Sequence, residues 1–196
     1  MLQVNLRMKC KFLLSTFSFL TLSICASVST LAGTLDHFNY VLQAKHGVDL
    51  SVLSRGPVQL GEIIDQRNNL SGKQISQDSD LNILVAQLIR NAIAQGFAQG
   101  GATLVETDPQ TILGGELTEF QVETINKDGA QVYQTTVRAK IKLQAANGGQ
   151  NYWQNSIFGR ATVPIDQGMD ASVQQALDKF VVGLFIDEYL LIELLD

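Results

Sequence analysis

The sequence predicts an α+β fold: an antiparallel sheet, made of a three-strand meander plus one or two further strands, with two helices packed on one face. The meander is expected over residues 111–163, where two Gly-containing turns separate three extended segments. In residues 133–144 apolar and polar side chains alternate, as in a strand with one buried and one wet face. Helical periodicity at residues 81–99 and 173–195 supplies the two helices.

Residues 1–32 have the order of a cleavable secretory signal peptide. A basic start precedes a mainly apolar run at residues 12–26, and small residues ending in Ala32 follow as a leader peptidase requires. The apolar run is too short and too rich in hydroxyl groups for a membrane span. Translation from Met1 or from Met8 gives the same order of segments. We therefore predict export to the periplasm.

Cys25 raises the alternative of lipidation, which would make the protein an outer-membrane lipoprotein. Residues 22–25 have the length and position of a lipidation motif, but Ile24 stands where a small residue is usual. The sequence therefore favours Cys25 as an ordinary residue of the apolar run. Association with a membrane is expected only in the lipidated case.

Charge and cysteine content exclude several classes of partner. The chain has 14 basic and 19 acidic residues, and the leader contains three of the basic and none of the acidic ones, so the remainder has a net charge of −8. Such a charge argues against binding to nucleic acid. Both cysteines lie in the leader, so the remainder has no thiolate metal site and no disulfide.

Residues 33–57 are expected to form an N-terminal arm that packs only in part, because Gly47 and Gly56 interrupt any regular element. The arm contains His37 and His46. These residues could form a metal pair, but no third ligand is spaced to complete a site. We interpret both as solvated residues and expect no metal and no cofactor.

Residues 58–196 are expected to form a single α+β domain. Residues 58–65 read as its first strand, and a polar turn follows. The helix at residues 81–99 ends at Gly100, which can adopt the left-handed conformation of a helix stop. Residues 102–106 are expected to form a short strand before the meander.

The first strand of the meander changes its pattern part-way. Leu117 and Phe120 cannot share a face of a regular strand, because side chains alternate with a period of two. Gly114 and Gly115 are the natural place for a bulge that resets the faces.

Charged side chains fill the wet face of the meander. Glu119 and Glu123 are expected on the same face of the first hairpin as Arg138, Lys140 and Lys142. Opposed charges help to fix the register of a hairpin. The alternative is a charged face that binds a ligand, but neighbouring signs cancel, so we favour a solvated face.

Two regions are candidates for contact with a partner. Tyr152 and Phe158 fall on the nominally wet face of the third strand, either under the arm or against another molecule. The helix at residues 173–195 is apolar on most sides, so one sheet cannot cover it. Either the first helix and the arm complete the cover, or part of the helix contacts another molecule. Phe185 and Tyr189 are its candidate contact residues.

No arrangement of residues indicates catalysis. The glycines follow a helix and do not open one, so no phosphate loop is present. Glu62, Asp65 and Arg67 form the densest ionisable cluster, which could be an acid–base site. A turn cap and a local ion pair explain it more simply. The sequence predicts no enzyme.

The chain resembles the YajG-type family of bacterial envelope lipoproteins, and more distantly other small envelope lipoproteins, including the lipopolysaccharide-assembly and ABC-transport auxiliary types. The matching stretches are residues 58–67 with their Asp-x-Arg ending, residues 81–101, residues 103–105, and residues 113–163 with a Tyr-Trp strand start. The resemblance implies an envelope location and offers no catalytic residues.

The expected function is that of a non-catalytic, exported accessory protein of the cell envelope. It would act in envelope assembly or transport by contacting another envelope protein, through the last helix or a free sheet edge. The alternative is a carrier that holds a lipid or other apolar ligand between sheet and helices.

Overall fold

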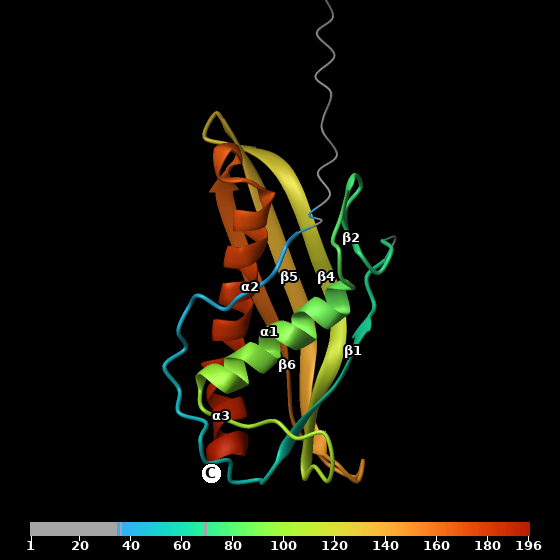
Figure 1. Ribbon diagram of the computed structural model, residues 1–196, viewed down its shortest axis with the longest axis vertical. Helices are drawn as coiled ribbons and strands as arrows, with labels where there is room; N and C mark the ends of the chain where they lie inside the picture. The colour runs from blue at the N-terminus through green and yellow to red at the C-terminus, as the bar shows by residue number, and fades with distance from the viewer. Residues whose placement is uncertain (1–34, 36, 69) are drawn as a thin grey trace, which may run out of the picture. The chain divides into compact units, whose positions relative to one another are not determined.

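The computed structural model describes Leu35, residues 37–68 and residues 70–196 (Figure 1). These residues form an α+β fold with a mixed four-stranded sheet, a small two-stranded sheet and three α-helices. The expected signal peptide at residues 1–32 and the lipidation candidate Cys25 lie outside the described residues. Within the described part, no helix combines the length and the apolar character needed to cross a membrane.

The large sheet has the strand order β1–β4–β5–β6. β4 (Thr111–Lys127), β5 (Ala130–Ala145) and β6 (Asn151–Pro164) pair antiparallel, which confirms the meander. β1 (Val58–Asp65) pairs parallel to β4, so the sheet is mixed and the expectation of an antiparallel sheet is corrected. Between these two strands the chain passes through helix α1 (Val85–Gln99), and a crossover of this kind returns the next strand in the parallel direction.

The helices cover one face of the sheet. α2 (Met169–Phe185) follows a 3₁₀ turn, η1 (Ile165–Gln167), and lies along β6 and β5 (Figure 1). The single helix expected at residues 173–195 is two helices, because the chain breaks after α2 and α3 (Glu188–Leu195) begins at a new cap. The cap is Asp187, whose carboxylate accepts a hydrogen bond from the Leu190 amide at 2.9 Å.

Two short segments differ from expectation. β2 (Gln74–Ser76) and β3 (Ser79–Asp80) form a small antiparallel hairpin where an irregular stretch was expected. Residues 102–106 are a loop and not a strand. Their Val105 amide donates to the Val58 carbonyl at 3.0 Å, but one hydrogen bond does not make a ladder.

The bulge of β4 lies later than Gly114–Gly115. The register of β4 against β5 shifts between Leu117 and Glu119, and this shift brings both Leu117 and Phe120 into the core. At Gly114 the reason for glycine is the close approach of β1. A Cβ atom there would lie 2.9 Å from the carbonyl oxygen of Glu62.

The core lies between the sheet and the helices. Where α2 approaches β6 most closely, a Cβ atom on Gly159 would overlap the carbonyl oxygen of Ala176. Each large side chain that is fully buried stabilises the fold by about 2 kcal/mol. The largest ones come from both sheets, both long helices and the arm: Leu50, Ile75, Ile89, Ile93, Phe97, Leu113, Leu117, Phe120, Ile141, Leu143, Phe180 and Phe185.

The arm is extended and runs across α1 and α2 (Figure 1). On the α1 side its backbone is held by glutamine side chains. The Gln95 amide group accepts from the Leu42 amide at 2.7 Å and donates to the Tyr40 carbonyl at 3.0 Å. Gln99, one helical turn later, makes the same two bonds with residues 44 and 46, at 2.9 and 3.2 Å.

On the α2 side the intervening arm residues are bound. Gln174 donates to the Val41 carbonyl at 2.9 Å, and Asp178 accepts from the Gln43 amide at 3.3 Å. Asp178 also accepts from the Tyr40 hydroxyl at 2.9 Å. Burial raises the pKa of Tyr40 far above its ordinary value, with the charge and hydrogen bond of Asp178 adding to the effect. Successive residues of the arm therefore bond α1 and α2 in turn, as successive residues of a central β-strand bond its two neighbouring strands.

Candidate functional site

Three exposed apolar side chains lie on α3 or directly before it, and we call them the α3 row. Ile186, Tyr189 and Ile192 are 53%, 73% and 50% exposed and recur every third residue. The opposite side of α3 is buried through Leu190 and Leu194. Large apolar side chains that gather on one side of a fixed helix are the usual mark of a contact surface.

α3 is held in place at both of its ends. At its start, Asp187 accepts hydrogen bonds from the Trp153 indole at 3.0 Å and from the Asn155 amide group at 2.8 Å, both on β6. Towards its end, Glu193 forms an ion pair with Arg55 of the arm. The row is therefore presented by an anchored helix and does not result from a frayed end.

The four expected contact residues have different surroundings. Tyr189 is the most exposed member of the row. Phe185 is fully buried and stacks on His46 with ring centroids 4.8 Å apart, so it does not lie at the surface. Tyr152 lies under the guanidinium of Arg55, a residue of the arm, which is 4.2 Å from the ring centre.

Phe158 is the fourth of these residues and points to the uncovered face of the sheet. It is 42% exposed, and the guanidinium groups of Arg138 and Arg160 lie 5.2 and 5.1 Å from its ring centre. Arg138 also pairs with Glu119 at 3.3 Å, which confirms the expected ion pair across the first hairpin. Phe158 therefore belongs to a different face from the α3 row.

The free edge of β6 is partly closed by polar side chains. Lys179 of α2 donates to the Arg160 carbonyl at 3.0 Å, and the Asn155 side chain accepts from the Ser156 amide at 2.8 Å. Such caps reduce the tendency of an edge strand to pair with another chain. The α3 row is consequently a better contact candidate than this edge.

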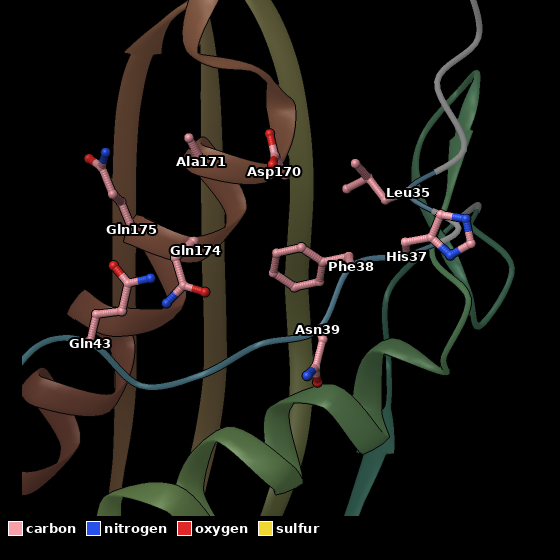
Figure 2. Close-up of a pocket in the computed structure, with 9 residues that line it drawn as sticks. All are labelled: Leu35, His37, Phe38, Asn39, Gln43, Asp170, Ala171, Gln174 and Gln175. Atoms are coloured by element: carbon pink, nitrogen blue, oxygen red, sulfur yellow. The ribbon is translucent and has the colours of Figure 1, made fainter.

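A hollow of about 660 Å³ lies between the arm and the first turns of α2 (Figure 2). His37, Phe38 and Asn39 line it from the arm, and Asp170 and Gln174 line it from α2. Gln174 is already bonded to the arm and to Asp178. No nucleophile with an adjacent base is formed by the residues that line this hollow.

His46 is fixed by the fold and is not solvated as expected. Its Nδ1 accepts from the Val48 amide at 3.1 Å, so Nε2 carries the proton and donates to the Gly96 carbonyl at 2.9 Å. His37 lies at the hollow beside Phe38. Across the described ranges no group of three or more His, Cys, Asp and Glu residues could hold a metal ion.

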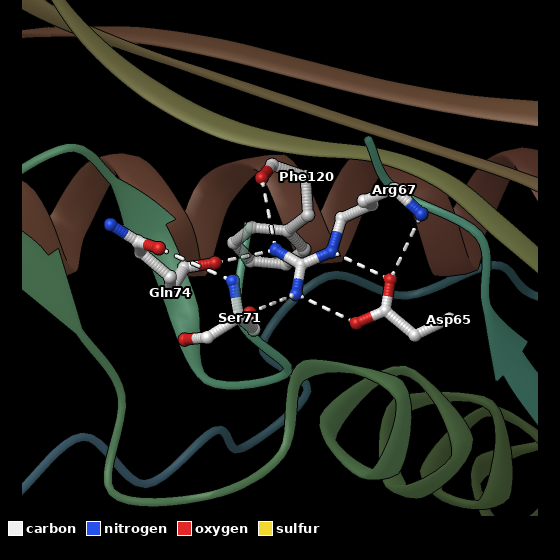
Figure 3. Close-up of polar contacts among 5 residues, drawn as sticks. All are labelled: Asp65, Arg67, Ser71, Gln74 and Phe120. Carbon is white, nitrogen blue, oxygen red and sulfur yellow. Dashed lines mark hydrogen bonds and ion pairs between the residues drawn. The ribbon is translucent and has the colours of Figure 1, made fainter. Parts of the chain in front are cut away.

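Asp65 and Arg67 form an ion pair that has a structural role (Figure 3). Arg67 donates twice to the Asp65 carboxylate, at 2.9 and 2.8 Å, and its remaining donors bond the carbonyls of Ser71, Gln74 and Phe120. Burial acts to raise the pKa of Asp65, but the hydrogen bonds and charge of Arg67 hold it below its usual range. Glu62 is exposed and takes no part in this ion pair.

The hydrogen bonds that Gln95 and Gln99 make to the arm, here called the glutamine ladder, were not expected from the sequence. The only signal is the recurrence of Gln95 and Gln99 four residues apart, which places them on one side of a helix. Glutamine is common on exposed helix faces, so this spacing does not by itself reveal a bound segment.

Comparison with known proteins identifies the fold. No protein-family model and no curated protein matches the chain. Among solved structures, protein XCC0632 from Xanthomonas campestris, of family DUF330, is similar with a TM-score of 0.56 and 9% identity, covering 78% of this chain and 92% of that one. The two proteins share a fold.

Two further solved structures are more distant. A minor lipoprotein from Acinetobacter baumannii has a TM-score of 0.42 and 8% identity, over 64% of this chain and 98% of that one. The PelC dodecamer from Paraburkholderia phytofirmans has a TM-score of 0.42 and 17% identity, over 67% and 91%.

Proposed function

We propose that this protein is a non-catalytic accessory protein of the bacterial cell envelope, of the YajG type, which is exported to the periplasm and binds another envelope protein through α3. The leader-like order of residues 1–32 supports export. The exposed row formed by Ile186, Tyr189 and Ile192 is the observation that carries the binding role.

The geometry of the row fits a helix that docks into an apolar groove. Tyr189 and Ile192 are three residues apart, so they lie on one side of α3, and Ile186 directly precedes the cap of this helix. Aromatic side chains surrounded by smaller apolar ones are typical energetic centres of protein interfaces. Tyr189 is therefore the expected anchor of the contact.

The packed interior favours binding of another protein over a function as a lipid carrier. Phe97 of α1 and Phe180 of α2 are fully buried between the helices and the sheet, as are Leu113 and Ile141 on the sheet. A lipid between these layers would have to displace side chains that are already packed. The hollow of Figure 2 lies beside the arm and not in this layer.

A photo-crosslinking amino acid at position 189 tests the proposal in intact cells. We expect a crosslink to one envelope protein, whereas the same probe at Gln175, an exposed residue on α2, should give none. Absence of a crosslink from position 189, in cells where the protein has reached the periplasm, would contradict the role of α3.

Two further measurements separate the remaining parts of the proposal. The mass of the mature N-terminus shows whether the leader has been removed and whether Cys25 carries acyl chains. Native mass spectrometry of protein prepared without detergent shows whether an apolar ligand is bound. A retained lipid would favour the carrier function instead.

A further inference from the structure

The uncovered face of the sheet contains a hollow of about 240 Å³ where β1, β4 and β5 lie side by side. In this row Gly114 of β4 is opposite Lys142 of β5, and on its other side it approaches Glu62 of β1. Neighbouring strands are about 4.8 Å apart, so the backbones of Glu62 and Lys142 are about 10 Å apart with only the Gly114 backbone between them.

The hollow is built into the pairing of the strands. A Cβ atom on Gly114 would lie 2.9 Å from the Glu62 carbonyl oxygen, and one on Gly61 would lie 2.8 Å from the Ile112 side chain. At Gly114 the obstacle is the β1 backbone, so the strands approach this closely only with glycine there, whereas at Gly61 the obstacle is a side chain. The consequence is a patch of bare backbone that forms the floor of the hollow.

The walls of the hollow carry opposite charges. Glu62 and Glu116 line the side of β1 and β4, and Lys140 and Lys142 line the side of β5. None of the four takes part in an ion pair with another described residue. By contrast, Glu119 and Arg138, the next charged pair along β4 and β5, close to 3.3 Å.

We propose that this hollow binds a small zwitterion. Its ammonium group would lie against Glu62 and Glu116, and its anionic group against Lys140 and Lys142, through charge-assisted hydrogen bonds. The hollow has room for a headgroup-sized molecule such as phosphoethanolamine.

The site is independent of the α3 contact and goes beyond it. α3 packs beside the covered face of the sheet, whereas the hollow opens on the other face. All four charged side chains are in contact with solvent, which weakens each interaction. Binding is therefore expected in the millimolar range.

Nuclear magnetic resonance titration with O-phosphoethanolamine tests the proposal on protein purified from the cells that produce it. We expect saturable shifts of the Gly61, Gly114 and Lys142 amides. The double variant Lys140→Gln, Lys142→Gln should weaken binding at least tenfold. The matched control replaces Lys73 and Lys127, which lie outside the hollow, with Gln and should bind as before.

Inorganic phosphate separates a zwitterion site from a simple anion site. Replacing Glu62 and Glu116 with Gln should weaken phosphoethanolamine but leave phosphate unchanged or tighter, because only the former has an ammonium group. If phosphate binds as tightly as phosphoethanolamine in the unchanged protein, or if the Lys73 and Lys127 control loses binding equally, the proposal is overturned. Absence of saturable shifts overturns it as well.

Vesicles distinguish the two sources of this chemistry. Co-sedimentation with phosphatidylethanolamine vesicles, lost in the Lys140→Gln, Lys142→Gln variant, would identify a lipid headgroup as the ligand. Binding to free phosphoethanolamine without co-sedimentation would identify a soluble zwitterion. Either result supports the site that the titration defines.

Discussion

The carboxylate of Asp187 accepts a hydrogen bond from the indole nitrogen of Trp153 at 3.0 Å. The same carboxylate bonds the side chain of Asn155 and caps α3 at the Leu190 amide. The Asp187 side chain therefore caps α3 directly after the break that follows α2, and it also bonds this helix to β6. The direction in which the apolar row of α3 points depends on this residue.

Replacing Asp187 with Ala should lower the free energy of unfolding by about 2 kcal/mol, because the helix loses its cap and the Trp153 indole loses its acceptor. Urea denaturation measures the change. Glu188→Ala, one residue further on, is the matched control and should change stability by less than about 0.5 kcal/mol. Equal effects of the two variants would show that Asp187 is not the anchor.

Replacing Gln95 with Glu should release the arm locally. A carboxylate cannot donate to the Tyr40 carbonyl, so one bond of the ladder is lost and two acceptors face each other. We expect faster hydrogen exchange at the Leu42 amide. Gln87→Glu, at an exposed position of the same helix, should leave this amide protected.

Replacing Asp65 with Ala should lower the free energy of unfolding by about 3 kcal/mol, because the Arg67 side chain is only 2% exposed and would lose its charged partner. Thermal or urea unfolding measures the loss. The control Asp78→Ala removes an exposed carboxylate from the nearby hairpin and should have little effect. A comparable loss in the control would point to the loop and not to the ion pair.

The Asp65–Arg67 pair also predicts a dependence on pH. The pKa of Asp65 is lowered in the folded protein, so its contribution is complete above the unfolded value of about 3.9 and is lost as the pH falls through the folded value. Stability measured from pH 6 down to pH 2 should therefore fall less steeply in Asp65→Ala than in the unchanged protein. Parallel curves would contradict the assignment.

Two glycines should respond oppositely to alanine. Gly159→Ala places a methyl group against the α2 backbone at Ala176 and should cost about 1–3 kcal/mol or more. Gly183→Ala meets only ordinary contacts, at 3.7 Å or more, and should stabilise α2 by up to about 1 kcal/mol. Melting temperatures that shift in the same direction for both variants would refute this account of the packing.

Local patterns predicted much of the sheet. The alternation in residues 133–144 defined β5, and Glu119 and Arg138 fixed its register with β4 as expected. The strand at residues 58–65 was also correctly bounded, because its apolar run ends in a polar turn. These features depend on side chains close in sequence, which is where periodicity is informative.

Other features depend on contacts between distant parts of the chain. The parallel pairing of β1 follows from the path of the crossover, which no residue of β1 encodes. The break at Asp187 is hidden because apolar residues continue on both sides of it, and its partner Trp153 is 34 residues away. Phe185 was a candidate contact residue because a helix so apolar needs cover from another molecule or from the arm and the first helix, and the arm and α1 supply that cover.

The zwitterion hollow was accessible to sequence reasoning only as a charged face. Lys140 and Lys142 were visible on the wet face of the first hairpin, but Glu116 was not among the charges expected there, and Glu62 comes from β1, whose place beside β4 was not predicted. A glycine that opens a hollow and a glycine that permits a bulge look alike in a sequence. Only the strand order separates them.

The arm connects two distant points of the domain. At one end the Leu35 amide bonds the Asp80 carbonyl at 3.1 Å, and at the other the Ser54 amide bonds the Leu194 carbonyl of α3 at 2.9 Å. A pull applied between the start of the arm and a partner on α3 would thus run along the arm. The glutamine bonds would be loaded together in shear, a geometry that resists mechanical force far better than peeling them one at a time.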